Sequence, residues 1–265
     1  MEKAIFITVR TGSSRLPQKA LIKIDGVTTI EHLIERIKHS KKQDGIVLCT
    51  TQKSVDDVLV EIAASHGIES FRGSTEDKLE RWNGAAKKFG VEFFVTADGD
   101  DLFCEPELMD LAFDQYEINK PDFIAGDGKG IIVGSFTYGV KASALGQVCR
   151  IKDTIDTEMM WVYFTDTGLF KCEDLDLEKV PDVYKRPEIR MTLDYPDDLR
   201  FFESVIHHFN QARPNEYYSL QDIVLYLDEN PDIIKINQYL MNQFRSNQEQ
   251  RIVLKLKPNY QDLIK

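Results

Sequence analysis

The sequence has few cysteines and no long apolar run, and both shortages restrict what the chain can be. Its four cysteines lie far apart among 265 residues, and no two of them form a CxxC pair: Cys49, Cys104, Cys149 and Cys172. This spacing argues against a zinc site and is typical of reduced thiols in a cytoplasmic protein. No segment approaches the roughly 18 apolar residues of a membrane span, so we expect no membrane partner. The N-terminal apolar run is too short for a signal peptide, and we therefore expect cytoplasmic localisation.

Positive charge is also scarce. The chain has 33 Lys and Arg residues against 44 Asp and Glu residues, a formal net charge of -11. Binding to a nucleic-acid backbone needs a broad basic face, so we expect no nucleic-acid partner. A small anionic substrate stays possible, because one local cationic pocket can oppose the overall field. The length and the 42% hydrophobic content suit a single α/β domain spanning residues 1–265.

The scarce cations are concentrated near the N-terminus, after an apolar strand predicted from Ile5 to Val9. The segment that follows, which we call the cationic loop, contains Arg10, Thr11, Gly12, Ser13, Ser14, Arg15 and Lys19. A loop after the first strand of an α/β chain lies at the sheet edge where such folds bind ligands. Glycine and serine let backbone N–H groups approach an anion, and three cations can offset phosphate charges. The pattern predicts a triphosphate site, although a merely solvated basic loop is the alternative.

Strand and helix patterns alternate through the first half of the chain. Predicted strands are 45–51, 68–71 and 93–96, and predicted helices are 29–39, 55–66 (with Ser54 as N-cap), 77–89 and 106–118. This alternation predicts an α/β fold with a doubly wound, mostly parallel sheet covered by helices.

The second half of the chain has a different pattern. Between residues 131 and about 180 the segments are shorter and mixed, which predicts an antiparallel extension or a dimerisation arm that also shapes an acceptor pocket. Beyond it we expect a strand over 190–194 and helices over 197–209, 219–227 and 234–244. Residues 246–265 are compatible with an added strand or a loose tail, and the sequence assigns them no role.

Two predicted strands end in carboxylates. One precedes the run Asp98-Gly99-Asp100-Asp101, and the other ends at Asp194, before Pro196. Carboxylates at the sheet edge beside a phosphate site are what Mg²⁺ requires, because it binds one or two carboxylates together with phosphate oxygens. The alternative is an acidic turn or a helix cap. Asp197 and Asp198 are explained as first-turn acids that the helix dipole favours.

The cationic loop also carries a resemblance. Its RTGSSRLPQKAL resembles the signature loop of the CTP-dependent sugar-acid cytidylyltransferases, which include the CMP-Kdo synthetases, the CMP-sialate synthetases and the spore-coat polysaccharide subgroup. The pattern R-x-x-S-x-R-L-P-x-K-x-L is matched at Arg10, Ser13, Arg15, Leu16, Pro17, Lys19 and Leu21. Val9 replaces the small residue that usually precedes it. The resemblance implies the nucleotide-diphospho-sugar transferase (GT-A-like) fold.

The resemblance implies roles for residues in both acidic segments. The segment around Asp100 is similar to the family's G-D-x-P motif, with Leu102 in place of the proline, and the segment around Asp194 is similar to L-T-V-D-x-P-E-D-L. It implies that Asp100 and Asp194 are the magnesium ligands, with Asp98 nearby. It also implies that Arg15 and Lys19 neutralise the β- and γ-phosphates and that Arg10 contacts the α-phosphate.

Three further segments resemble family motifs. Arg72, Gly73 and Ser74 match the start of an R-G-S-x-x-D-V-L-x-R stretch that lies by the nucleoside, although Ser74 is also a plausible helix cap. Glu158 aligns with a family acid in a segment that shapes the acceptor pocket or a dimer contact, and Trp161 replaces part of the usual pattern there. Arg190 is a candidate to bind the acceptor's anionic group.

The hypothesis is a cytidylyltransferase, catalytic through Arg10, Arg15, Lys19, Asp100 and Asp194, that moves CMP from CTP to an anionic acceptor and releases pyrophosphate. It would use Mg²⁺ and form a homodimer. The acceptor would be a sugar acid, or alternatively a phosphonate or a phosphorylated polyol. Asp98-Gly99-Asp100 is also a D-x-D, which is typical of nucleotide-sugar glycosyltransferases. That activity, or a non-catalytic nucleotide-binding protein, is the alternative function.

Overall fold

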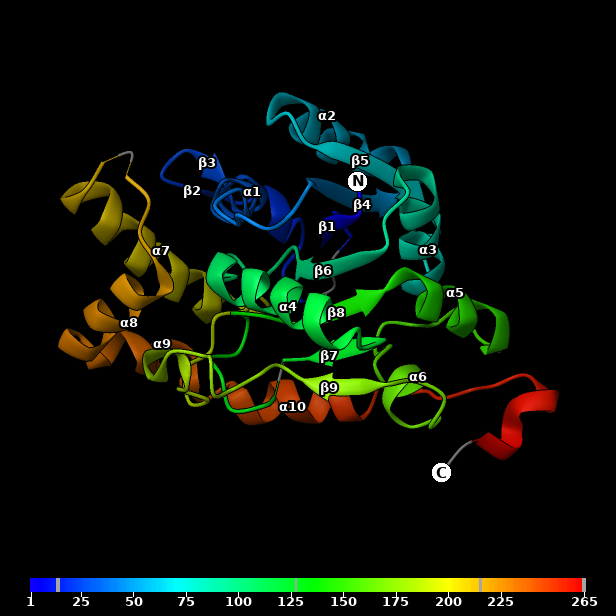
Figure 1. Cartoon of the computed structure of the whole chain (residues 1–265). Helices are drawn as coiled ribbons and strands as arrows, with labels where there is room; N and C mark the ends of the chain where they lie inside the picture. Colours follow the sequence, from blue (N-terminus) through cyan, green and yellow to red (C-terminus); the bar gives the residue numbers. More distant parts are fainter. Residues whose placement is uncertain (13–14, 127, 215, 264–265) are drawn as a thin grey trace.

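A seven-stranded sheet lies at the centre of the computed structural model, which describes residues 1–12, 15–126, 128–214 and 216–263 (Figure 1). In spatial order its strands are β5 (Glu69–Gly73), β4 (Gly45–Thr51), β1 (Lys3–Thr8), β6 (Phe93–Asp98), β8 (Tyr138–Lys141), β7 (Phe123–Ala125) and β9 (Cys172–Asp174). The first four strands are mutually parallel, and β8 runs antiparallel between β6 and β7. The prediction of a doubly wound, mostly parallel sheet with an antiparallel extension is confirmed.

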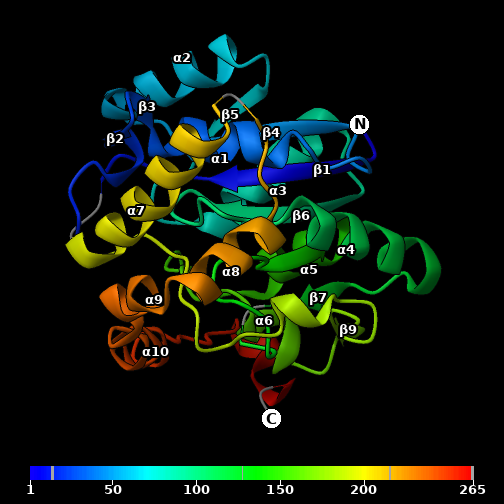
Figure 2. The same ribbon diagram turned by 90° about the vertical axis from the view of Figure 1, so that its left-hand side faces the viewer.

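Helices cover both faces of the sheet (Figures 1 and 2). Ile5 and Ile7 of β1 belong to a core shared with α1 (Thr29–Ile37), α2 (Asp57–Ser65), α4 (Pro106–Asn119), α7 (Pro196–Ala212) and α8 (Leu220–Glu229). Ala4 and Phe6 face the other core, shared with α3 (Lys78–Phe89), α5 (Ala142–Ile151) and α6 (Val162–Thr165). Because successive side chains of a buried strand enter different cores, both must be apolar, which explains the continuous apolar runs.

The remaining elements are short. The hairpin of β2 (Lys23–Ile24) and β3 (Val27–Thr28) precedes α1, and α9 (Pro231–Gln238) and α10 (Met241–Glu249) follow α8. The described residues also form four 3-10 turns: η1 (Lys19–Leu21), η2 (Ser54–Asp56), η3 (Asp182–Tyr184) and η4 (Pro258–Leu263). Among the described residues, no helix combines the length and the apolar character that a membrane crossing needs.

Three local predictions were wrong. Ser54 does not cap α2; it begins η2, and α2 starts only at Asp57. The helix expected over 234–244 is two helices, because the chain turns between α9 and α10 and thereby brings Phe244 over Arg190. The strand expected over 190–194 forms only an isolated bridge to Val133, and the neighbouring chain then turns away at Gly134, where φ is +86°.

The region from 131 to 180 contains the antiparallel strand β8 and the short strand β9, as the pattern predicted. The C-terminal segment is neither a full strand nor a loose tail: it forms one antiparallel bridge, between Leu256 and Lys152, and ends in η4. The homodimer, the dimerisation role of residues 131–180 and the single-domain organisation stay predictions.

Gly134 allows a close backbone approach that positions the pocket described below. A Cβ at this position would lie 2.1 Å from the backbone oxygen of Met191, and its φ is in the left-handed region. We expect Gly134→Ala to lower the free energy of unfolding by about 3 kcal/mol or more, because backbone must move. Gly130→Ala is the control: φ is +96° there, but nothing lies within 4 Å of a new Cβ. It should cost about 1–2 kcal/mol. Urea unfolding of both variants measures the difference, and equal losses would contradict the steric argument.

Candidate active site

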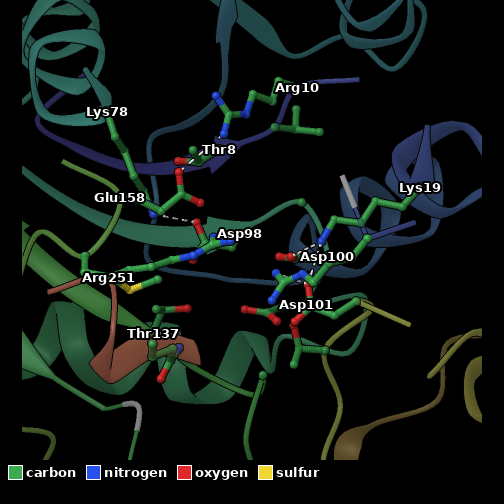
Figure 3. A pocket seen from close by; sticks show the side chains of 18 of the residues that line it. Thr8, Arg10, Lys19, Lys78, Asp98, Asp100, Asp101, Thr137, Glu158 and Arg251 are labelled. Atoms are coloured by element: carbon green, nitrogen blue, oxygen red, sulfur yellow. Dashed lines mark hydrogen bonds and ion pairs between the residues drawn. The ribbon is translucent and has the colours of Figure 1, made fainter. Parts of the chain in front are cut away.

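A pocket opens at the carboxyl ends of β1 and β6, next to the start of β8 (Figure 3). Several distant segments line it: the cationic loop (Arg10, Gly12, Arg15, Lys19), the end of β6 (Asp98, Gly99, Asp100, Asp101), the entry to β8 (Val133, Gly134, Phe136, Thr137, Tyr138), Glu158 to Trp161, Asp194, and α10 with Arg251. The structure therefore brings together the cationic loop and both predicted acidic segments.

Asp100 and Asp194 share one cation. The Lys19 ammonium donates to Asp100 and also to Oδ1 of Asp194, at 3.0 Å. A backbone hydrogen bond of 2.8 Å from Leu193 N–H to the Asp100 carbonyl holds the two segments side by side. The oxygens of the two carboxylates therefore converge on one ammonium group inside the pocket.

Burial and neighbouring charges shift these groups in different directions. Burial raises the pKa of Asp100, and the Asp194 and Asp98 carboxylates raise it further, against the effect of Lys19. Burial would also raise the pKa of Asp194, but Lys19 and Arg15 outweigh it and lower that pKa. Burial opposes the charge of Lys19, yet the two carboxylates raise its pKa. The pair therefore depends on a nearby cation to carry two negative charges.

Asp194 is held from behind by a buried network. Arg190 donates to Asp194 at 3.2 Å and to both oxygens of Asp198, at 3.0 and 3.1 Å. Asp198 in turn accepts the backbone N–H groups of Asp194 and Tyr195, each at 2.9 Å, and the side chain of Asn237. Asp198 is more than a first-turn acid, because it fixes the backbone of the residue that faces the pocket.

The prediction for Arg190 was wrong. We predicted that it binds the acceptor, but its side chain is 0% exposed and does not line the pocket. Its guanidinium is instead paired with Asp194 and Asp198 and lies over the ring of Phe244. The sequence does not show which side chains are in contact. From the sequence alone, an arginine that binds the acceptor could therefore not be distinguished from one that pairs with buried carboxylates.

The cationic loop is anchored by a carboxylate outside it. Asp56 accepts the Thr11 backbone N–H at 2.8 Å and the Thr11 hydroxyl at 2.7 Å. Thr11 is buried, and both its backbone N–H and its hydroxyl donate to Asp56. In this arrangement neither donor is available for the predicted contact with the nucleotide. Gly12 and Arg15 line the pocket, and Arg15 donates to Asp194 at 2.6 Å. Ser13 and Ser14 lie outside the described residues.

A second group of charges occupies the other half of the pocket. Arg10 donates to Glu158 at 3.4 Å and to the Thr75 carbonyl at 3.3 Å. Lys78 pairs with Asp98 at 3.1 Å and lies over the ring of Trp82. The structure thus places Arg10, Asp98 and Glu158 at the pocket, as the sequence predicted, and adds Lys78, which we missed. Its helical position alone gave no sign that it faces β6.

Arg72, Gly73 and Ser74 lie beside the pocket and do not line it. Arg72 donates to the carbonyls of Thr51 and Lys53 and pairs with Asp57. The Ser74 hydroxyl accepts the Asp77 N–H in the turn before α3, but the N-cap of α3 is Asp77, so the capping alternative for Ser74 was wrong. Thr75 and Glu76, the next residues along the chain, reach the pocket. The segment predicted to lie by the nucleoside is therefore next to the pocket. Its Arg72 and Ser74 side chains bind neighbouring backbone groups and do not face the pocket.

No pattern in the sequence indicated that α10 contributes to the site. Four pocket residues come from α10 and the residues just after it: Phe244, Asn247, Gln248 and Arg251. No motif marks this segment, because it reaches the pocket only through the path of the folded chain.

Comparison with known proteins agrees with this geometry. Residues 4–227 match the family described as cytidylyltransferase. The chain is 28% identical to the spore coat polysaccharide biosynthesis protein SpsF of Bacillus subtilis over 85% of this chain and 94% of that protein. It is 33% identical to an uncharacterised protein of Methanocaldococcus jannaschii over 87% and 92% of the two chains.

Solved structures show the same similarity. A cytidylyltransferase from Leptospira borgpetersenii superposes with a TM-score of 0.78 at 27% identity, covering 88% of this chain and 97% of that one. A CMP-2-keto-3-deoxy-manno-octonic acid synthetase complexed with CTP shares the fold, with a TM-score of 0.59 at 14% identity over 78% and 99% of the chains.

The fold and the pocket define a nucleotidyltransferase. The chain belongs to the cytidylyltransferase family, in the subgroup that includes the spore-coat protein, and it is a CTP-dependent enzyme. Membership of this family argues against both alternative functions, the nucleotide-sugar glycosyltransferase and the non-catalytic binding protein.

The buried network predicts a sharp difference between two adjacent acids. Asp198→Ala leaves the Arg190 guanidinium buried without its main partner, and we expect the free energy of unfolding to fall by about 3–5 kcal/mol. Asp197→Ala is the matched control, because the partly exposed Asp197 carboxylate contacts two exposed partners, Arg200 and the Tyr239 hydroxyl. It should leave unfolding nearly unchanged. Chemical denaturation measures both variants, and similar midpoints would show that the network does not stabilise the fold.

Proposed function

We propose that this chain transfers CMP from CTP to an anionic acceptor and releases pyrophosphate. An acceptor oxygen would attack the α-phosphorus, a new oxygen–phosphorus bond would form, and the bond to the β-phosphate bridging oxygen would break. When that oxygen belongs to a hydroxyl, its proton would pass to solvent. The observation that supports this reaction best is the convergence of Arg15, Lys19, Asp100 and Asp194 at one sheet edge. Such transfers depend mainly on positioning and charge neutralisation.

The carboxylate pair fits a magnesium ion. Asp100 and Asp194 already share one ammonium group, and Mg²⁺ is commonly held by two carboxylates, substrate phosphates and water. When bound, the ion would neutralise charge on the phosphate oxygens. No larger cluster of His, Cys, Asp or Glu that could hold a metal occurs among the described residues, so this pair is the candidate.

Lys19 would change partners when the substrate binds. Its ammonium now neutralises the two carboxylates, which is the charge that a metal ion would supply. If a bound cation neutralised Asp100 and Asp194, the Lys19 ammonium and the Arg15 guanidinium would be available to contact the β- and γ-phosphates. Arg10, at the other half of the pocket, would contact the α-phosphate. This exchange keeps the carboxylates neutralised both before and after CTP arrives.

The acceptor is proposed to be a sugar acid. Relatives similar to this chain over 42–46% of its length are named 3-deoxy-manno-octulosonate cytidylyltransferases. A phosphonate or a phosphorylated polyol is the alternative, because an anion site can accept either chemistry.

Pyrophosphate release tests the reaction. The protein would be incubated with each of the four nucleoside triphosphates, Mg²⁺ and a panel of sugar acids, phosphonates and polyol phosphates. We expect pyrophosphate with CTP and one acceptor class, and its loss when EDTA removes the metal. Asp100→Asn should lower the rate by about 100-fold or more, because it removes one carboxylate charge from the metal pair.

Asp182→Asn is the control for that variant, since Asp182 is 94% exposed and pairs with Lys185 at the surface. Its rate should match that of the wild-type protein. CTP turnover that is equally fast without a divalent cation would rule out the magnesium role. Turnover of GTP or ATP in preference to CTP would contradict the nucleotide assignment.

Arg15 provides a second test of the triphosphate site. Arg15→Ala should lower kcat/KM for CTP by about 10- to 100-fold, because a charge-assisted contact to phosphate is lost. Arg200→Ala, at a position that is 69% exposed, should have no effect. Steady-state kinetics at saturating acceptor measure both. An unchanged kcat/KM in Arg15→Ala would place the triphosphate elsewhere.

A further inference from the structure

Arg251 is the one pocket cation whose charged group makes no hydrogen bond or ion pair with any described residue. The other cations that line the pocket have partners: Arg10 with Glu158, Arg15 and Lys19 with Asp194, Lys78 with Asp98, and Arg81 with the Ser74 carbonyl. Arg251 lines the same pocket, and Figure 3 shows its side chain extending into it. An arginine fork is suited to bind a carboxylate or a phosphonate.

The chain on both sides of Arg251 is anchored, so its position is defined. Before it, α10 is held by the Phe244 ring over Arg190 and by a 2.9 Å hydrogen bond from Asn247 to the Tyr195 hydroxyl. After it, Lys257 N–H donates to the Ile151 carbonyl at 2.9 Å, and Asp153 N–H donates to the Lys255 carbonyl at 2.8 Å. We call residues 241–257 the C-terminal strap, because they cross the pocket between these two attachments.

The part of the strap that carries Arg251 lies across the end of β6 from Arg10. Along the sheet β6 is between β1, which leads into the cationic loop, and β8. In Figure 3, Thr8 and Arg10 lie above Asp98, whereas Thr137 and Arg251 lie below it. The carboxylates at the end of β6 thus separate a nucleotide side from a second side. If CTP occupies the side of the cationic loop, the second side is left for the acceptor.

We propose that Arg251 binds the anionic group of the acceptor, so that the C-terminal strap supplies part of the acceptor subsite. Met159 and Trp161 line the same pocket and offer apolar surface to a sugar ring. The proposal rests on the proposed function and replaces the role first predicted for Arg190. It also assigns a role to a segment that lies beyond the residues matched to the family, which end at 227.

The test is direct binding of two probes, 3-deoxy-manno-octulosonate and inorganic phosphate, to protein saturated with Mg²⁺ and a non-hydrolysable CTP analogue. Saturation keeps the probes out of the triphosphate site. Calorimetry should show that Arg251→Ala weakens binding of at least one probe by about tenfold or more, as expected for a lost charged hydrogen bond. Arg251→Lys should restore part of it. The probe that responds identifies a carboxylate or a tetrahedral anion as the preferred group.

Arg245→Ala is the matched control, because Arg245 is an exposed cation of α10 that does not line the pocket. It should bind both probes as the wild-type protein does. All variants should show the same increase in melting temperature with CTP, which separates loss of the acceptor subsite from damage to the nucleotide site.

Equal probe binding in Arg251→Ala and wild type, or no binding of either probe to the wild-type protein, would overturn the proposal. Failure of the proposed function has a different signature: CTP would not raise the melting temperature of the wild-type protein. In that case the same titrations without nucleotide still show whether Arg251 binds an anion.

Discussion

The placement of Asp194 beside Asp100 is the constraint on which the rest of the site depends. Asp194 is almost fully buried and follows an irregular segment, so no regular secondary structure determines where its carboxylate points. Arg190 and Asp198 determine it instead, through hydrogen bonds to its side chain and its backbone. Without them the second carboxylate would be free to turn away from β6, and the pocket would lose one of the two carboxylates that pair with Lys19.

That placement has an electrostatic consequence. Two carboxylates that share one buried site repel each other, and each charge is stable only when a cation lies close. Lys19 provides that cation here, and it comes from the same loop as the cations proposed to bind phosphate. The loop and the carboxylates are therefore coupled: a change in one alters the charge that the other can hold. A metal ion and a triphosphate arriving together would satisfy both at once.

The second half of the pocket is built differently. Its walls come from the entry to β8, the segment around Trp161 and the C-terminal strap, all of which are outside the motifs of the cationic loop and β6. A shared fold commonly keeps its nucleotide machinery and varies the elements that surround the second substrate. The strap is such an element, since a few backbone hydrogen bonds and one stacked arginine hold it across the opening.

The sequence by itself determined the order of strands and helices, because apolar periodicity and caps such as Thr28, Asp77 and Ser219 act over a few residues. It also indicated where the charged residues of the pocket lie, since the cationic loop and Asp100 follow β1 and β6, whose carboxyl ends meet at one sheet edge. Asp194 follows an irregular segment and reaches that edge only in the folded chain. Only the tertiary structure decided which cations are free. Arg190 is buried by Asp194 and Asp198, four and eight residues away, and by Phe244, about fifty residues away, whereas Arg251 faces the pocket. Such contacts depend on the path of the whole chain, and no local pattern encodes them.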